Sequence, residues 1–434
     1  RVSYANNTSF YNPFVTPEFQ STYGATSGSL QSWGQKLAQP STYDPLDFYQ
    51  TGWNETNSLT ISNGNEKNQT FLSMAATNAE GIVQNNTLDR YNFTIRNTTS
   101  MLDDKLRLDL SAAYMNVREQ NMVSQGQYFN PIVATYLMSP SYSLETYQLF
   151  EMYDESRGFK TQYWPWGNMG LGMQNPYWIA YRNLRTNYKK RYMLSASLSY
   201  DVTDWFNVSG RVRVDNSNTK YEEKLYASSN PTLTEGSTQG FYAISKPDET
   251  QIYADVLANI NKRFGNYSLV VNVGASIVDN KYDELSYRGP IRANGIPNVF
   301  NVFDLDNTQK KARQDEWEEQ TQSVFASAEL GWKSMLYLTL TGRNDWASQL
   351  ANSSTSSFFY PSVGISALIS EMMKLPEWVD FLKVRGSFSS VGMPYPRNLT
   401  SPTYEYDETT QTWKPKTHYP IGDLKPERTN SWEV

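Results

Sequence analysis

The sequence predicts an all-β protein whose long antiparallel strands form a transmembrane barrel. Three observations favour this fold class: apolar and polar residues alternate in many segments, the links between these segments alternate in length, and aromatic residues are abundant. Aromatic residues make up 14% of the 434 residues, whereas charged residues make up only 19%. No segment approaches the roughly 18 consecutive apolar residues of a membrane helix, but a barrel strand needs only about 9–11 alternating residues.

Alternation with a period of two identifies the individual strands. Residues 192–200 carry Leu194 and other apolar residues at even positions, and Met193 followed by three serines, Ser195 among them, at odd positions. After a short turn at 201–204, residues 206–214 repeat the same alternation, which predicts a hairpin. Further alternating segments occupy residues 106–114, 267–277, 324–332 and 336–343.

The two faces of these strands differ in chemistry, which predicts their surroundings. Leu194, Val212 and Leu338 lie on apolar faces, so we expect them to point to lipid. Ser195 and Arg211 lie on the opposite faces, which suit a water-filled lumen.

The connections between the strands are short and long in turn, which predicts short periplasmic turns at one end and long extracellular loops at the other. The short links are residues 63–67, 100–104, 201–205, 263–266 and 331–335. The long links are residues 79–88, 119–189, 223–249, 281–316, 348–356 and 393–426. Phe264 and Trp332 lie near short turns, where an interfacial aromatic girdle is expected. With residues 1–11 as the first strand and a last strand from near Arg428, we count about 14 strands, interrupted by a short helical turn within 371–381.

Composition excludes most other classes of protein. The net charge of −6 offers no counter-charge to nucleic acid, and the absence of cysteine excludes disulfide scaffolds and thiol chemistry. His418 is the single histidine, so a catalytic triad or a histidine-rich metal site is not expected. Asp304 and Asp306 lack the glycine and glutamate spacing of a calcium loop. We therefore predict no enzyme, no cofactor and no metal site. A soluble β-sandwich or repeat protein is the alternative fold, but soluble strands average only about 5–6 residues.

Several segments, in order along the chain, resemble one family of outer-membrane proteins. They are FQSTYGATSGSLQSWG (19–34), the hairpin region 58–93, LTGRNDWAS (340–348), SFFYPSVGISALISE (357–371), KVRGSFSSVG (383–392) and LKPERTNSWEV (424–434). Together they resemble the SusC/RagA family of TonB-dependent outer-membrane transporters. The resemblance implies that residues 1–434 are part of a larger barrel of 22 strands, with an N-terminal plug and final strands that this chain does not contain.

The resemblance also implies a function and partners. A transporter of this kind spans the outer membrane of a Gram-negative bacterium many times and contacts its lipid. It takes up oligosaccharides delivered by a SusD-like surface lipoprotein, and it reaches TonB through the N-terminal region. A peptide importer of the same architecture and a passive porin are the alternatives. A barrel hydrolase is a third class, for which a chain with only His418 supplies scarcely any catalytic groups.

The loop 119–189 contains the candidate ligand-binding residues. Its aromatic side chains could stack on sugar rings, although internal packing is the commoner use of such residues. The predicted binding residues are Tyr163, Trp164, Trp166, Tyr177 and Trp178. Asn168, Gln174 and Asn175 would add hydrogen bonds to a sugar. Arg157, Lys160, Arg182 and Arg185 could instead meet carboxylates, so peptide remains open while oligosaccharide is preferred.

Overall fold

The protein is described by a computed structural model. It describes residues 1–11, 20–26, 29–30, 32–122, 126, 128–167, 173–393, 395–407, 409–417, 419–423 and 425–434. Asn168 and His418 lie outside these residues, as do Phe19 and Leu424 at the starts of two family-like segments. Among the described residues, no helix is long and apolar enough to cross a bilayer.

One large antiparallel sheet dominates the structure, as the alternation predicts. In the described part of the chain it has 14 strands, and each strand pairs with the next large strand along the chain. These are β1 (Val2–Tyr11), β2 (Gly52–Gly64), β3 (Asn68–Glu80), β4 (Thr87–Met101), β5 (Leu106–Gln120), β8 (Asn183–Thr203), β9 (Phe206–Tyr226), β10 (Gly240–Phe264), β11 (Tyr267–Pro290), β12 (Lys311–Trp332), β13 (Leu336–Ala347), β14 (Phe358–Leu368), β15 (Lys383–Met393) and β18 (Glu427–Glu433). We call this sheet the wall. Among the described residues it is not closed into a barrel, because the strand order begins at β1 and ends at β18.

Smaller elements lie in the links. Two hairpins are formed by β6 (Glu151–Asp154) with β7 (Phe159–Gln162) and by β16 (Tyr404–Asp407) with β17 (Thr412–Pro415). The short helices are η1 (Pro45–Phe48), α1 (Pro131–Leu137), α2 (Leu144–Tyr147), α3 (Pro176–Arg182), η3 (Val302–Asp304), η4 (Ser348–Leu350) and α4 (Ile369–Met372). The helical turn expected within 371–381 is therefore shifted towards the N-terminus. Pro376 restricts its preceding residue to extended conformations, which opposes a helix through that point.

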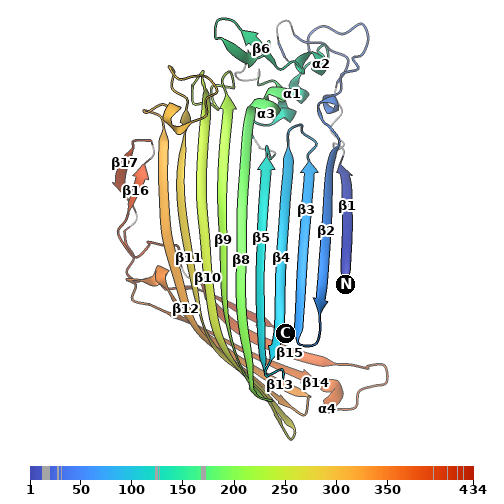
Figure 1. Ribbon diagram of the computed structural model, residues 1–434, viewed down its shortest axis with the longest axis vertical. Helices are drawn as coiled ribbons and strands as arrows, with labels where there is room; N and C mark the ends of the chain where they lie inside the picture. Colours follow the sequence, from blue (N-terminus) through green and yellow to red (C-terminus); the bar gives the residue numbers. More distant parts are fainter. Residues whose placement is uncertain are drawn as a thin grey trace.

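Short turns and long loops lie at opposite ends of the wall, which confirms the predicted asymmetry, except that the link 369–382 lies at the end of the short turns (Figure 1). Several strands continue further into the long links than the alternation indicates. For example, β8 begins at Asn183 and β10 spans 25 residues. A membrane strand needs only about 9–11 residues, so these strands extend well beyond the bilayer. There both faces meet water, and apolar alternation ends although the backbone pairing continues.

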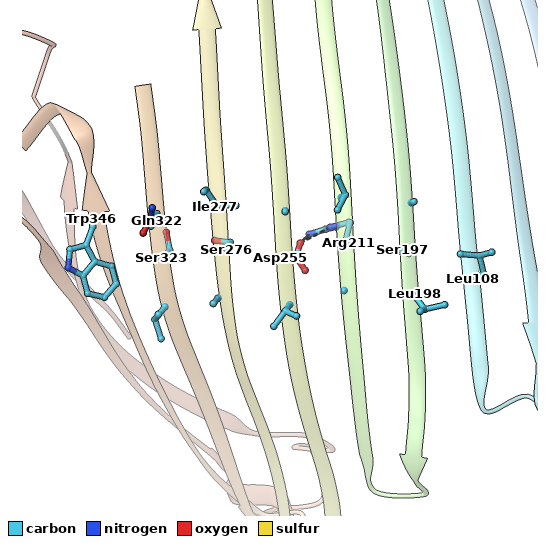
Figure 2. A pocket seen from close by; sticks show the side chains of 17 residues that line it. Leu108, Ser197, Leu198, Arg211, Asp255, Ser276, Ile277, Gln322, Ser323 and Trp346 are labelled. Carbon is cyan, nitrogen blue, oxygen red and sulfur yellow. Dashed lines mark hydrogen bonds and ion pairs between the residues drawn. The ribbon is translucent and has the colours of Figure 1, made fainter. Parts of the chain in front are cut away.

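The strand register confirms the two predicted faces. Ala196 lies opposite Val212, Val212 opposite Ala254, and Ala254 opposite Ile277, so one face is apolar across four strands. On the other face Ser197 lies opposite Arg211, and Arg211 opposite Asp255. Leu338 aligns with Leu330 and Ile365 on the apolar face. Figure 2 shows Arg211 joined to Asp255 between neighbouring strands, at 2.7 Å.

Two rows of aromatic side chains border the apolar face. The upper row includes Tyr114, Tyr192, Trp346 and Phe359, and the lower row includes Tyr200, Phe264, Tyr267 and Trp332. All eight are substantially exposed and share the parity of the apolar face. Tyr192 and Tyr200 are eight residues apart, which corresponds to about 27 Å along a strand and about 20 Å of height after a tilt of about 40°. The lower girdle was predicted, whereas the upper girdle was missed because its residues lie mid-strand.

The buried apolar side chains of the described residues gather mainly in the long loops. The largest cluster contains Leu30, Phe48, Ala134, Met138, Leu144, Tyr147, Trp164, Met173 and Tyr177. We call the described residues of 20–51 and 121–182 the cap. In Figure 1 the cap lies above the ends of the strands, on the side of the long loops. A wall with lipid on one side and a lumen on the other has no interior of its own, so the conventional core forms outside the membrane.

Candidate functional site

The cap positions the predicted binding residues through two asparagine–proline steps. Asn130 and Asn175 accept hydrogen bonds from the backbone N–H groups of Ile132 and Tyr177, and each precedes a proline at the first helical position. This pairing of an N-cap side chain and a proline starts α1 and α3. Helical periodicity is not visible in seven-residue helices, but the two Asn-Pro steps were a usable signal.

The aromatic residues predicted to bind ligand are packed mostly against each other. Trp164 and Trp166 meet edge to face with ring centroids 4.6 Å apart, and Tyr147 contacts both rings at 5.3 and 5.1 Å. Tyr177 packs edge to face on Phe48 at 5.1 Å. Internal packing therefore occupies much of the ring surface that a sugar would need.

Trp178 is the most deeply placed of the five residues. Its side chain is 1% exposed, and its indole N–H donates to the hydroxyl oxygen of Ser229 at 2.9 Å. That hydroxyl donates in turn to the side-chain oxygen of Asn183 at 2.8 Å. Trp164 and Tyr177 are also buried, whereas Tyr163 and Trp166 are half-buried. Only the last two present substantial ring surface to a ligand.

The amides predicted to meet a sugar hold the cap together. Gln174 donates to the carbonyl of Tyr128 at 2.8 Å and accepts from the N–H of Asn230 at 2.8 Å. Asn175 donates to the carbonyls of Tyr147 and Tyr163 at 2.9 and 3.2 Å. Both amides are fully buried. Their hydrogen bonds are made to backbone groups, and neither side chain faces an open surface.

Burial also raises the pKa of phenols in the cap. Burial raises the pKa of Tyr177 and of Tyr147, and it raises the pKa of Tyr49 to about 12. These hydroxyls stay neutral at physiological pH, so the aromatic packing carries no charge.

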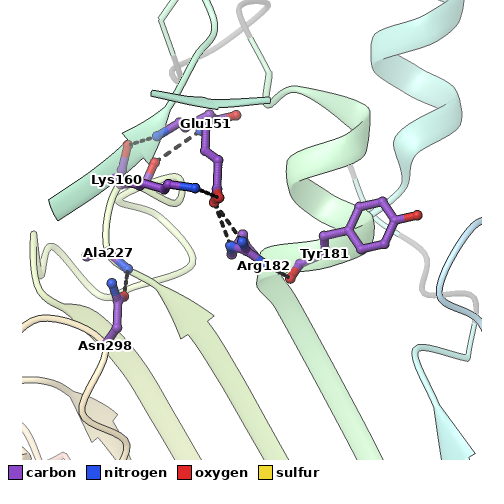
Figure 3. Close-up of polar contacts among 8 residues, drawn as sticks. Glu151, Lys160, Tyr181, Arg182, Ala227 and Asn298 are labelled. Carbon is purple, nitrogen blue, oxygen red and sulfur yellow. Dashed lines mark hydrogen bonds and ion pairs between the residues drawn. The ribbon is translucent and has the colours of Figure 1, made fainter. Parts of the chain in front are cut away.

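An ion pair joins the hairpin β6–β7 to the end of α3. The Glu151 carboxylate contacts Arg182 at 2.8 Å and Lys160 at 3.1 Å (Figure 3). Arg182 also lies over the rings of Phe150 and Tyr226, each at 5.2 Å. The basic residues considered for carboxylate binding are thus partly engaged within the protein. The loop between β11 and β12 contacts the same region, because the Asn298 side chain accepts a hydrogen bond from the N–H of Ala227 at 2.7 Å (Figure 3).

Sequence reasoning missed a second cluster, on the lumen-facing side of the strands above the membrane. Tyr282 and Trp317 lie opposite each other on β11 and β12, with parallel rings 5.3 Å apart. Arg397 lies over Trp317 at 3.9 Å and contacts Glu319 at 2.7 Å. Glu284 accepts from the hydroxyl of Tyr282 at 2.7 Å, and burial raises the pKa of Tyr282 to about 12. We call these five residues the mouth cluster.

The mouth cluster depends on pairing between segments distant in sequence. In the sequence alone, the charges around Glu319 are typical of a solvated group, because nothing local places Tyr282 beside Trp317. An alternation count extended through residues 311–320 would have put Trp317 and Glu319 on one face. In chemical terms, the cluster offers aromatic faces together with groups of both charges at the entrance to the lumen.

One groove of the sheet lies along its apolar face. A groove of about 860 Å³ crosses β5 and β8–β13, lined on the apolar face by Leu108, Ala196, Val212, Ala254, Ile277 and Trp346 (Figure 2). These side chains share the face between the two aromatic girdles. Lipid chains fill such a surface in a membrane, so this groove is not the candidate substrate site.

Together the sheet, the girdles and the polar inner face define an outer-membrane β-barrel protein. The family described as "TonB dependent receptor-like, beta-barrel" matches residues 140–434. The chain belongs to this family, whose members are transporters of the outer membrane. No curated protein matches the chain.

Solved structures agree with this assignment. The RagAB peptide importer in the "closed-closed" state matches with a TM-score of 0.72 at 15% identity, over 100% of this chain and 52% of that chain. The "open-open" state matches with a TM-score of 0.72 at 13% identity, over 100% and 51%. A further RagAB peptide transporter structure has a TM-score of 0.69 at 13% identity, over 89% and 42%. The chain spans about half the length of these transporters, and the SusC/RagA-type barrel that the sequence predicts is confirmed.

Proposed function

We propose that this chain is the barrel portion of a TonB-dependent importer that takes up an oligomeric nutrient handed over by a SusD-like surface lipoprotein. In this proposal residues 1–434 are part of a larger barrel, and a plug and a TonB-contacting segment belong to the N-terminal region of the full-length protein. Binding and passage, rather than covalent chemistry, carry out the function. The chain belongs to a family of transporters, which supports import as its general function.

Peptides are the substrate class that the geometry favours. The observation that carries this preference is the mouth cluster, where Arg397 and the carboxylates of Glu319 and Glu284 surround two aromatic rings. Peptides carry both charges and hydrogen-bonding main chains, which such a surface recognises. The similar RagAB structures are of a peptide importer, which supports the same choice.

Oligosaccharides are the second candidate. Tyr163 and Trp166 retain exposed ring surface in the cap, and stacking on sugar rings needs such surfaces. The buried state of Trp164, Tyr177 and Trp178 weakens this candidate, because their faces are covered by neighbours.

Uptake by intact cells separates these functions. A strain lacking the full-length protein should lose growth on defined peptides and keep growth on defined glycans, relative to its parent. Loss of growth on a glycan alone would reverse the substrate choice and leave import intact. Large, stable conductance of the full-length protein in planar bilayers would instead indicate a porin.

Exposed apolar side chains beyond the membrane support a protein partner. Phe303 is 86% exposed and Ile296 is 68% exposed, in the loop between β11 and β12. Leu149 and Tyr153 are also largely exposed, at the edge of the cap. Exposed apolar patches mark interaction surfaces, and an obligate partner would bury more than about 2,000 Å².

We expect Phe303→Ser with Ile296→Ser to reduce co-purification of the lipoprotein at least about tenfold, because apolar anchors dominate interface energies. The matched control is Trp378→Ser, an equally exposed residue (85%) in the link at the opposite end of the sheet. Pull-down of the full-length protein at native levels measures the effect. Equal recovery of the lipoprotein by the double variant and the parent would contradict this interface.

A further inference from the structure

Directly above the upper aromatic girdle, the lipid-facing side of the wall changes from apolar to basic residues. On β8, Lys190 lies two residues above Tyr192 with the same parity, and on β5 Arg118 lies four residues above Tyr114. Lys220 on β9 lies diagonally beside Lys190, because Lys190 is opposite Asn218. The register is continuous through these pairs, so all three cations point outward with the apolar face.

A fourth cation extends the group to β10. Lys246 falls in register with Lys220, because the pairs Ser245–Tyr221 and Asp248–Asn218 bracket them. Like charges directly opposite each other destabilise a sheet unless something compensates them. We call Arg118, Lys190, Lys220 and Lys246 the outer basic patch.

The carboxylates nearby do not fully neutralise this patch. Glu222 contacts Lys220 at 2.8 Å and Lys224 at 3.8 Å. Asp89 and Asp248 accept instead from the side-chain amides of Asn78 and Asn216. Among the described residues, no carboxylate lies within ion-pair distance of Arg118, Lys190 or Lys246. The surface of β5 and β8–β10 therefore keeps an excess of positive charge.

The height of the patch matches one layer of the membrane. Two to four residues above the girdle correspond to about 5–10 Å of height for strands tilted by about 40°. The headgroup layer on each side of a bilayer is about 5–8 Å thick. The cations consequently lie beside the headgroups of the outer leaflet, continuous with the surface that contacts the lipid chains.

From this placement we propose that the outer basic patch binds the phosphate groups of anionic lipids in the outer leaflet. Phosphates at this level compensate the opposed lysines, and each basic residue near an anionic membrane surface contributes about fivefold to the affinity. The outward face on β11 and β12 carries Asp283, Glu316 and a Glu318 that contacts Lys281 at 3.4 Å, so lipid contact of this kind is confined to one sector.

Lipid retention by the purified full-length protein tests the proposal. The probe is lipid A bearing two phosphates, with dephosphorylated lipid A as its comparison, and native mass spectrometry measures the bound lipid. The variant with all four patch residues changed to glutamine should bind lipid A at least about tenfold more weakly, and Lys190→Gln alone about fivefold. The parent should bind dephosphorylated lipid A as weakly as the four-residue variant binds lipid A.

The matched control is Lys189→Gln, which removes the same charge from the neighbouring residue on the lumen-facing side. Binding of lipid A should be unchanged in this variant. The proposal is overturned if the four-residue variant and Lys190→Gln bind lipid A like the parent, or if Lys189→Gln weakens binding equally. Displacement of the lipid by an equal concentration of inorganic phosphate would also overturn it, because the site would then be one for a free anion. Thermal unfolding of each variant verifies that the barrel is folded.

Discussion

Replacing Trp178 with alanine should lower the local stability of the cap by about 3–5 kcal/mol, because the change leaves a large cavity among buried side chains. Trp178 is 1% exposed and donates to Ser229, which belongs to a different loop. The loss of stability should therefore extend to both loops. Hydrogen exchange of the cap amides should quicken by a factor of at least about one hundred, with the strands unaffected.

The control for this prediction is Trp178→Phe. Phenylalanine retains most of the apolar volume but removes the N–H, so we expect a loss of only about 1–3 kcal/mol from the hydrogen bond that Ser229 no longer accepts and from the smaller ring. If exchange in the cap is unchanged in Trp178→Ala, the cap is not held by this core. If uptake of a glycan fails in Trp178→Phe while exchange stays slow, the residue contacts ligand instead.

The second large effect concerns the lipid-facing surface. Ala196 lies midway between Tyr192 and Tyr200 on the apolar face, so Ala196→Arg places a charge near the bilayer midplane. We expect the free energy of unfolding to fall by about 2–4 kcal/mol. Denaturant titration of the full-length protein folded into lipid vesicles measures this value.

Ser197→Arg is the matched variant on the adjacent residue. Ser197 lies between Asp109 and Arg211 on the lumen-facing side, where water and a carboxylate are available. Its loss of stability should be much smaller. An equal loss in both variants, or a greater loss in Ser197→Arg, would mean that the faces are assigned the wrong way round.

Strands with an apolar face were predictable from sequence because lipid enforces alternation residue by residue. The polar residues next to Leu194 and Val212 in the sequence indicate that each lies on the apolar face of its strand. The strand register then joins these two apolar faces into one. The strand extensions above the membrane were not predictable in this way. Around Lys190 and Glu318 both faces carry polar residues, so the sequence carries no periodic apolar signal although the ladder continues.

The candidate site was harder to predict than the fold. The aromatic content of the cap was visible, but composition does not distinguish a stacking platform from a core. Trp178 and Trp166 look alike in sequence, and their difference in burial arises from contacts with distant loops. The mouth cluster needed the pairing of Tyr282 with Trp317, which only the register of β11 with β12 supplies.

The location of the buried core has a consequence for how such a chain changes over evolutionary time. In most proteins the loops tolerate insertions and the regular elements resist them. Here the long loops hold the best-packed side chains, whereas the outward positions of the strands need only remain apolar. Diversification and the insertion of epitope tags should therefore be best tolerated at the short turns, such as residues 65–67, and least tolerated in the long loop between β5 and β8.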